Sequence, residues 1–139
     1  MTQITLKPAI AELQKHAKNA GAKEAPTLPP ETNVSFPFSV CYPAIGNFAG
    51  QSGGWEKDLT TVYLDVHFNR VDLPTDVDAV IMFLDDFKPL LIADPTLGGT
   101  VDTLQMSDTN PIPWEFGQMK YAGQETLGLR FRITFKQKT

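Results

Sequence analysis

The run from Leu127 to Lys136 constrains the fold more than any other part of the sequence. Five apolar residues alternate there with small, polar or basic residues, and the apolar set is Leu127, Leu129, Phe131, Ile133 and Phe135. This period of two predicts a strand with one buried face and one basic, solvated face. Such a strand needs a sheet around it and a layer over its apolar face, so the rest of the chain must supply both.

Two segments have the period of an amphipathic helix and can supply that layer. In residues 5–20 the apolar positions recur at steps of three and four, Thr5 can cap the first turn and Gly21 is a natural end. Pro89 predicts a kink or an early end in the second segment, residues 72–93. The apolar stripe of that segment consists of Val77, Val80, Ile81, Leu84, Phe87 and Leu91.

The other strands are predicted from alternation and from turn residues. Residues 34–42 have a period of two, and Pro37 favours the edge of a sheet or the beginning of a strand. In residues 59–68, alternate positions predict a buried face and a solvated face, the solvated one being Thr61, Tyr63, Asp65 and His67. Shorter strands are predicted at 100–106 and 114–121, bounded by glycine turns.

The order of these elements is helix, two strands, helix, three strands. It predicts a single α+β domain over residues 1–139, with a mixed, mostly antiparallel sheet of about four to five strands and two helices packed on one face.

Composition excludes several functions. Twelve basic and sixteen acidic residues give a net charge of −4, which argues against a specific nucleic-acid clamp. Cys41 is the only cysteine, so the chain has no internal disulfide or cysteine-rich zinc site, and we expect Cys41 to be a small buried hydrophobe. There is no apolar run near the ~20 residues that span a bilayer and no signal-peptide pattern, so we expect a soluble protein without a membrane partner.

The sequence contains only weak motifs for catalysis or metal binding. Gly50-Gln51-Ser52-Gly53-Gly54 matches the nucleophile elbow of a small serine hydrolase, with Ser52 as nucleophile. The segment after it is predicted as a strand, however, and His67 lies in mid-strand, so a flexible glycine hairpin is the preferred interpretation. Asp85 and Asp86 point about 100° apart on a helix, which indicates a solvated helix face. His67 is predicted as a surface histidine and not a metal ligand. We therefore expect no catalytic residue, no cofactor and no metal, and a protein that is not an enzyme.

Charge is distributed unevenly along the chain. Residues 58–108 hold ten acidic and two basic residues, whereas residues 120–138 hold five basic residues and one acidic residue. One interpretation is that each segment has a solvated face. The other is that the acidic surface of one copy meets the basic strand face of another copy, so that both would serve self-assembly.

One long stretch resembles a known family. It is Leu90-Leu91-Ile92-Ala93-Asp94-Pro95-Thr96-Leu97-Gly98-Gly99-Thr100-Val101-Asp102, followed by Trp114-Glu115-Phe116-Gly117, Tyr121-Ala122-Gly123 and the closing alternating strand. With the initial helix, proline-bearing strand and glycine-rich hairpin, this pattern resembles the tail terminator (tail completion) proteins of tailed bacteriophages over most of the chain.

The resemblance implies a virion structural protein. In that family a small α+β subunit forms a ring of six copies that caps the finished tail tube, ends its growth and offers a head-tail joining surface. The implied partners are further copies of the chain, the tail tube protein and a head-completion or neck protein, while DNA only passes through the ring. The implied location is the tail or neck of the virion, assembled in the host cytoplasm. The resemblance brings no catalytic signature.

The candidate assembly-interface residues are Phe48, Trp55, Trp114, Phe116, Arg130 and Arg132. The aromatic ones fall in the predicted hairpin loop 46–55 and in segment 107–116, which combine loop character with large apolar side chains. Trp114 and Phe116 could equally be core aromatics. Trp55→Ala is expected to fold normally but to give tails of uncontrolled length or tails that do not join heads. The alternatives are another neck, connector or baseplate ring component, a monomeric binding module and the serine hydrolase.

Overall fold

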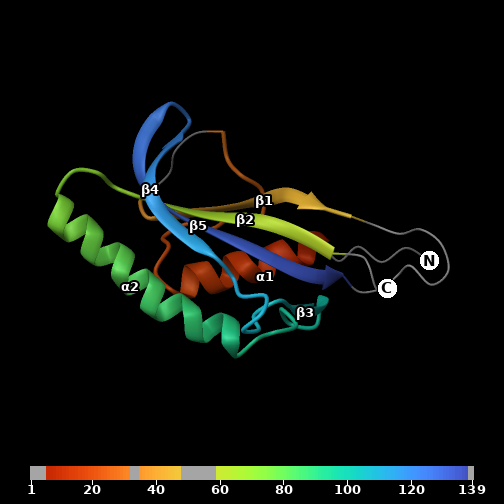
Figure 1. The fold of residues 1–139 in the computed structure, drawn as a ribbon. Helices are drawn as coiled ribbons and strands as arrows, with labels where there is room; N and C mark the ends of the chain where they lie inside the picture. Colours follow the sequence, from red (N-terminus) through yellow and green to blue (C-terminus); the bar gives the residue numbers. More distant parts are fainter. Residues whose placement is uncertain (1–5, 32–34, 48–58, 138–139) are drawn as a thin grey trace.

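The fold is α+β, with two helices packed on one face of a five-stranded sheet (Figure 1). The computed structural model describes residues 6–31, 35–47 and 59–137. The elements in chain order are α1 (Leu6–Asn19), β1 (Phe38–Gly46), β2 (Leu59–Phe68), α2 (Leu73–Ile92), β3 (Val101–Leu104), β4 (Trp114–Tyr121) and β5 (Gln124–Gln137).

Strand β5 organises the sheet. It pairs along one edge with β2, and its other edge is shared by β4 and β3, while β1 pairs only with β2. All of these strand pairs are antiparallel. The register with β2 ends at Phe68 opposite Leu127, whereas β4 follows β5 as far as Gln124, so the β4–β5 hairpin extends past the end of β2 (Figure 1).

The predicted alternation of β5 is confirmed. Its five apolar side chains are 5% exposed or less and belong to one core cluster with both helices. Helix α1 contributes Leu13 together with Ala9 and Ala17, whose small side chains let the helix lie close to the sheet. Helix α2 contributes Phe87, whose ring centroid lies 5.0 Å from that of Phe131.

The ends of α2 depart from one prediction. Its start is held by Asp76, whose carboxylate accepts the backbone N–H of Val71 (2.9 Å) and of Asp72 (3.0 Å). The prediction at Pro89 was a kink or an early end, and the early end is wrong, because the helix continues through Pro89 to Ile92. Pro89 is exposed, but Phe87 and Leu91, two residues before and two residues after it, are buried in the core. Their packing holds the last turn in place despite the missing hydrogen bond.

Several predicted boundaries also shift. Strand β1 begins at Phe38, directly after Pro37, and continues through Pro43 because an edge strand tolerates proline. The predicted start at Val34 lies outside the described residues, as does the predicted cap Thr5. Strand β3 is shorter than the predicted 100–106, and β5 is longer than the predicted run.

The main wrong prediction concerns the sheet face opposite the helices, which was expected to be solvated. Asp65 and His67 were predicted to be solvated, but they are 3% and 2% exposed. The β1–β2 register places Phe38 and Val40 beside them on that face. The connector before β1 also covers it, because the Tyr121 hydroxyl donates a hydrogen bond to the Pro30 carbonyl and the Tyr121 ring lies 5.2 Å from the His67 ring. Both faces are therefore buried at this end of the sheet.

Candidate functional site

Large apolar side chains remain exposed beside the outer edge of the sheet. Trp114 and Phe116 lie two residues apart on β4 and are 54% and 44% exposed, so neither is a core residue. On α2, Ile81 and Ile92 are 52% and 59% exposed. Leu84, on the same side of α2 as Ile81, is half-buried. We call the group Ile81, Leu84, Ile92, Trp114 and Phe116 the α2–β4 apolar surface.

A groove of about 660 Å³ runs between the two elements of this surface. Leu84 and Ile92 line it from α2 and Trp114 lines it from β4, with Asp85 and Lys88 beside them. Ile81 was predicted to be buried, which is wrong. Val80 occupies the core, and Ile81 is turned about 100° from it around the helix axis, on the side of Leu84 and Lys88.

A hydrogen-bonded network occupies the opposite face of the sheet. The buried Asp65 carboxylate accepts hydrogen bonds from Arg130 Nε (2.9 Å) and Nη2 (3.1 Å) and from the Tyr42 hydroxyl (2.7 Å). The Arg130 guanidinium also lies 4.6 Å from the centre of the Tyr63 ring. Burial, followed by the hydrogen bond to Asp65, raises the pKa of Tyr42 to about 12. The bond to Asp65 raises the pKa of Arg130 as well, so near neutral pH Tyr42 keeps its proton and Arg130 keeps its charge.

His67 and Thr126 form a pair that superficially suggests catalysis. His67 Nδ1 lies 2.7 Å from Thr126 Oγ1, the distance of a base to a nucleophile. Thr126 is fully buried and His67 is 2% exposed, so no substrate can reach the hydroxyl. Burial lowers the pKa of His67, which keeps its ring neutral at neutral pH. Burial also raises the pKa of the Cys41 thiol to about 12, so the predicted buried cysteine is confirmed and its thiol is not activated.

The two oppositely charged segments partly neutralise each other within the subunit. Asp65 pairs with Arg130, and Asp102 lies 3.9 Å from Lys136. Arg132 is exposed, with its guanidinium 5.9 Å from the Tyr63 ring. Of the two candidate interface arginines, Arg132 is therefore the one whose charge is more exposed to solvent.

The candidate interface residues divide into separate groups. Trp114 and Phe116 share a strand face, whereas the register places Arg130 opposite Glu115, on the other face of the sheet. Phe48 and Trp55 lie outside the described residues, and so does Ser52 of the hydrolase alternative.

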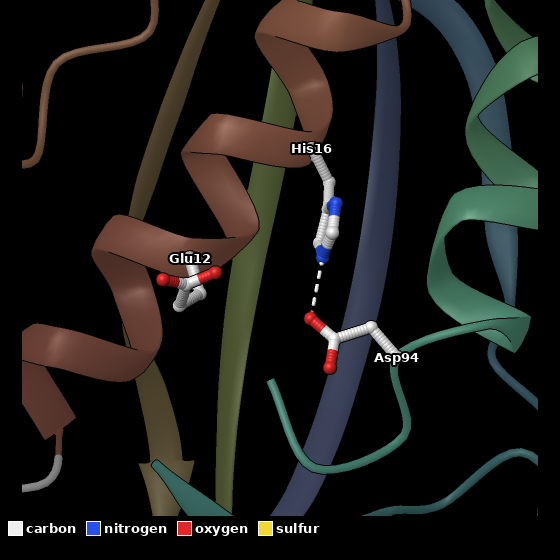
Figure 2. Close-up of side chains that lie close together, drawn as sticks. All are labelled: Glu12, His16 and Asp94. Carbon is white, nitrogen blue, oxygen red and sulfur yellow. Dashed lines mark hydrogen bonds and ion pairs between the residues drawn. The ribbon is translucent and has the colours of Figure 1, made fainter. Parts of the chain in front are cut away.

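One cluster was missed by the sequence interpretation. His16 on α1 and Asp94, after α2, form a hydrogen bond of 2.7 Å, and Glu12 lies one helical turn before His16 (Figure 2). The pKa of Asp94 is lowered, first by the Gly98 backbone N–H and then by His16. The spacing of Glu12 and His16 was visible in the sequence, but Asp94 lies 78 residues further along the chain.

Comparisons with protein-family models and with curated proteins find no match for this chain. Neither described helix has the length and apolar character that crossing a membrane would require.

Proposed function

We propose that this chain is a structural protein of tailed-phage virions. In this proposal copies of it form a ring that caps the tail tube, ends tube growth and offers the surface for joining tail to head. Its partners are further copies, the tube protein and a neck protein, and DNA passes through without being bound specifically. The sequence resemblance described above supports the proposal over most of the chain.

The observation that carries the proposal is the α2–β4 apolar surface. Monomeric proteins rarely leave several large apolar side chains exposed together, and such surfaces mark sites of protein association. Trp114 is also the residue type that most often dominates binding energy at interfaces. The groove beside it offers a recess into which a side chain of a neighbouring subunit can pack.

The buried polar groups agree with a structural role. In the part of the chain that the structure describes, Thr126 and Cys41 are out of reach of substrate, and the Asp65 carboxylate is occupied by three hydrogen bonds from Arg130 and Tyr42. These groups stabilise and orient the sheet. Among the described features, the α2–β4 apolar surface can therefore contribute most to the free energy of binding a partner.

Replacing Trp114 tests the proposal in a phage that encodes this chain. Trp114→Ala should leave the thermal unfolding of the purified protein nearly unchanged, because the side chain is more than half exposed. Electron microscopy of the particles should show tails of uncontrolled length or tails without heads.

Met82→Ala is the matched control. Met82 is 57% exposed but lies on the far side of α2 from the groove, so this variant should give normal particles. Normal infectious particles from Trp114→Ala would exclude the α2–β4 apolar surface as the interface. Normal particles from a phage that lacks the whole coding sequence would overturn the function itself.

A further inference from the structure

Three side chains that metals commonly use converge between α1 and the turn after α2. They are Glu12 and His16, one helical turn apart on α1, and Asp94 (Figure 2). One donor atom from each lies within 4.8 Å of the other two. His16 and Asp94 already touch through a hydrogen bond of 2.7 Å, and the Glu12 carboxylate faces them across a small gap (Figure 2).

The turn that carries Asp94 is built to hold its carboxylate in this place. The backbone N–H of Gly98 donates to Asp94 Oδ1 at 2.9 Å, which leaves Oδ2 directed at His16. Gly98 has a φ of +66°, and a Cβ at this position would lie 3.1 Å from Glu12 Cδ. A glycine here therefore lets the turn approach Glu12 closely while fixing Asp94.

Glu12 is free to adjust. Its carboxylate makes no hydrogen bond or ion pair with another described residue. Ligands lie about 2.1 Å from a Zn²⁺ ion, so the donors of a tetrahedral site are about 3.4 Å apart. The donor atoms now lie within 4.8 Å of one another, so Glu12 has to shift by at most about 1.4 Å, and no existing bond of Glu12 breaks. His16 Nε2 and Asp94 Oδ2, now 2.7 Å apart, have to separate by about 0.7 Å to admit the ion.

We propose that Glu12, His16 and Asp94 form a binding site for a divalent transition-metal ion of the zinc type. The donor set of one imidazole and two carboxylates suits Zn²⁺ or Co²⁺, whereas Mg²⁺ and Ca²⁺ prefer oxygen ligands alone. Three protein donors leave a fourth position to water, and the partial exposure of His16 and Asp94, 13% and 25%, gives water and the ion access.

The tautomer of His16 limits the affinity. A carboxylate can only accept, so the Nε2 proton is donated to Asp94, and coordination of a metal by Nε2 requires a tautomer with the proton on Nδ1. Nδ1 is buried and has no partner among the described residues. The metal-bound form therefore lacks the hydrogen bond that usually supports a ligating histidine, and we expect a dissociation constant in the micromolar range and not in the nanomolar range.

Binding would clamp two distant parts of the chain. His16 and Asp94 are 78 residues apart, and an ion held between them joins α1 to the end of α2 only when the protein is folded. The ion should therefore raise the thermal unfolding temperature in proportion to the logarithm of its free concentration above the dissociation constant.

The test uses the full chain, freed of metal with a chelator and then titrated with ZnCl₂. We expect one Zn²⁺ per chain, a rising unfolding temperature and, with CoCl₂, the visible absorption of a low-symmetry site. Glu12→Gln and Asp94→Asn should each weaken Zn²⁺ binding by about tenfold or more. Glu12→Gln is the more informative variant, because Glu12 has no bond whose loss could unfold the protein.

Glu24→Gln is the control, since it removes an exposed carboxylate elsewhere and should leave binding unchanged. Absence of binding at about 100 μM Zn²⁺ would overturn the proposal, as would equal affinity in Glu12→Gln and the wild type. Equal stabilisation by Mg²⁺ at the same concentration would also overturn it, because that result indicates oxygen ligands only. None of these readouts depends on the proposed function in the virion.

Discussion

At the scale of single residues, Asp65 has an unusual position. Its carboxylate is nearly inaccessible to water, yet it is an anion that accepts three hydrogen bonds from two partners on neighbouring strands. A buried charge is tolerated only when its partners stay in place. Asp65 therefore couples β1, β2 and β5 through side chains in addition to the backbone ladder.

Asp65→Asn should lower the free energy of unfolding by about 2–3 kcal/mol. The amide removes the charge that Arg130 pairs with and cannot accept all of the present hydrogen bonds. Equilibrium unfolding in urea measures the change. Glu125→Gln removes the exposed pair with Arg70 and should cost less than about 0.5 kcal/mol. Equal losses in the two variants would contradict the importance of the buried network.

His67 should make the protein less stable as the pH falls. Its folded-state pKa is lowered, chiefly by burial and also by Arg130, against an opposing effect of Asp65, whereas in the unfolded chain it titrates at the ordinary 6.5. Below about pH 6.5 the unfolded state therefore binds a proton that the folded state does not bind, and this contribution to stability is lost progressively.

The measurement is urea unfolding from about pH 7.5 to about pH 5. In His67→Gln the side chain can still form a hydrogen bond with Thr126 but does not titrate. Subtracting the free energy of unfolding of this variant from that of the wild type therefore removes the contribution of the carboxylates to the pH dependence. Wild-type stability should fall more steeply over this interval than that of the variant. If the free energy of unfolding varied with pH in parallel for the two proteins, His67 would bind protons equally in the folded and unfolded states.

At the scale of elements, α2 contains two prolines in contrasting positions. Pro74 lies in the first turn, where a helix has no acceptor for its N–H, and Pro89 lies near the end, where the Asp85 carbonyl loses its donor. The two sites separate the effect of the missing hydrogen bond from the general effect of proline on the unfolded chain.

Pro89→Ala should raise the free energy of unfolding by about 2 kcal/mol, because it restores that hydrogen bond on an exposed helix face. Pro74→Ala should change stability by less than about 0.5 kcal/mol. Thermal or urea unfolding of the two variants measures the contrast. A loss of stability in Pro89→Ala would mean that the proline ring itself is needed by the end of α2.

The elements also show how far the sequence could predict the structure. Periodicity predicted both helices and the strands β1, β2 and β5, because each of them buries at least one face. The shorter strands β3 and β4 were predicted with the help of the turns that bound them, since β4 has no buried residue. It could not predict that Phe38 and Val40 point away from the helices while Ser39 and Cys41 point toward them. Alternation assumes one solvated face, and here the connector and the β4–β5 hairpin cover the second face as well.

At the scale of the whole molecule, the fold brings together charged and metal-ligating side chains that lie far apart in the sequence. The sequence left two interpretations of the acidic and basic segments, a solvated face on each or a contact between copies. In the structure Asp65 meets Arg130 and Asp102 meets Lys136 within one subunit. The spacing of Glu12 and His16 was visible in the sequence, but nothing indicated that Asp94 joins them, because no local pattern links α1 to a turn after α2. Contacts that span such separations depend on the tertiary arrangement alone.

The central place of β5 has a consequence for biosynthesis. Helix α1 and the β1–β2 hairpin can begin to form while translation continues. Among the described residues, however, β3 and β4 pair with residues 124–137 alone, which the ribosome makes later. Until that segment leaves the exit tunnel, the apolar face of β2 and the aromatic side chains of α2 lack the strand against which they pack. The nascent chain is therefore most prone to aggregate, and most in need of a chaperone, in the interval just before β5 emerges.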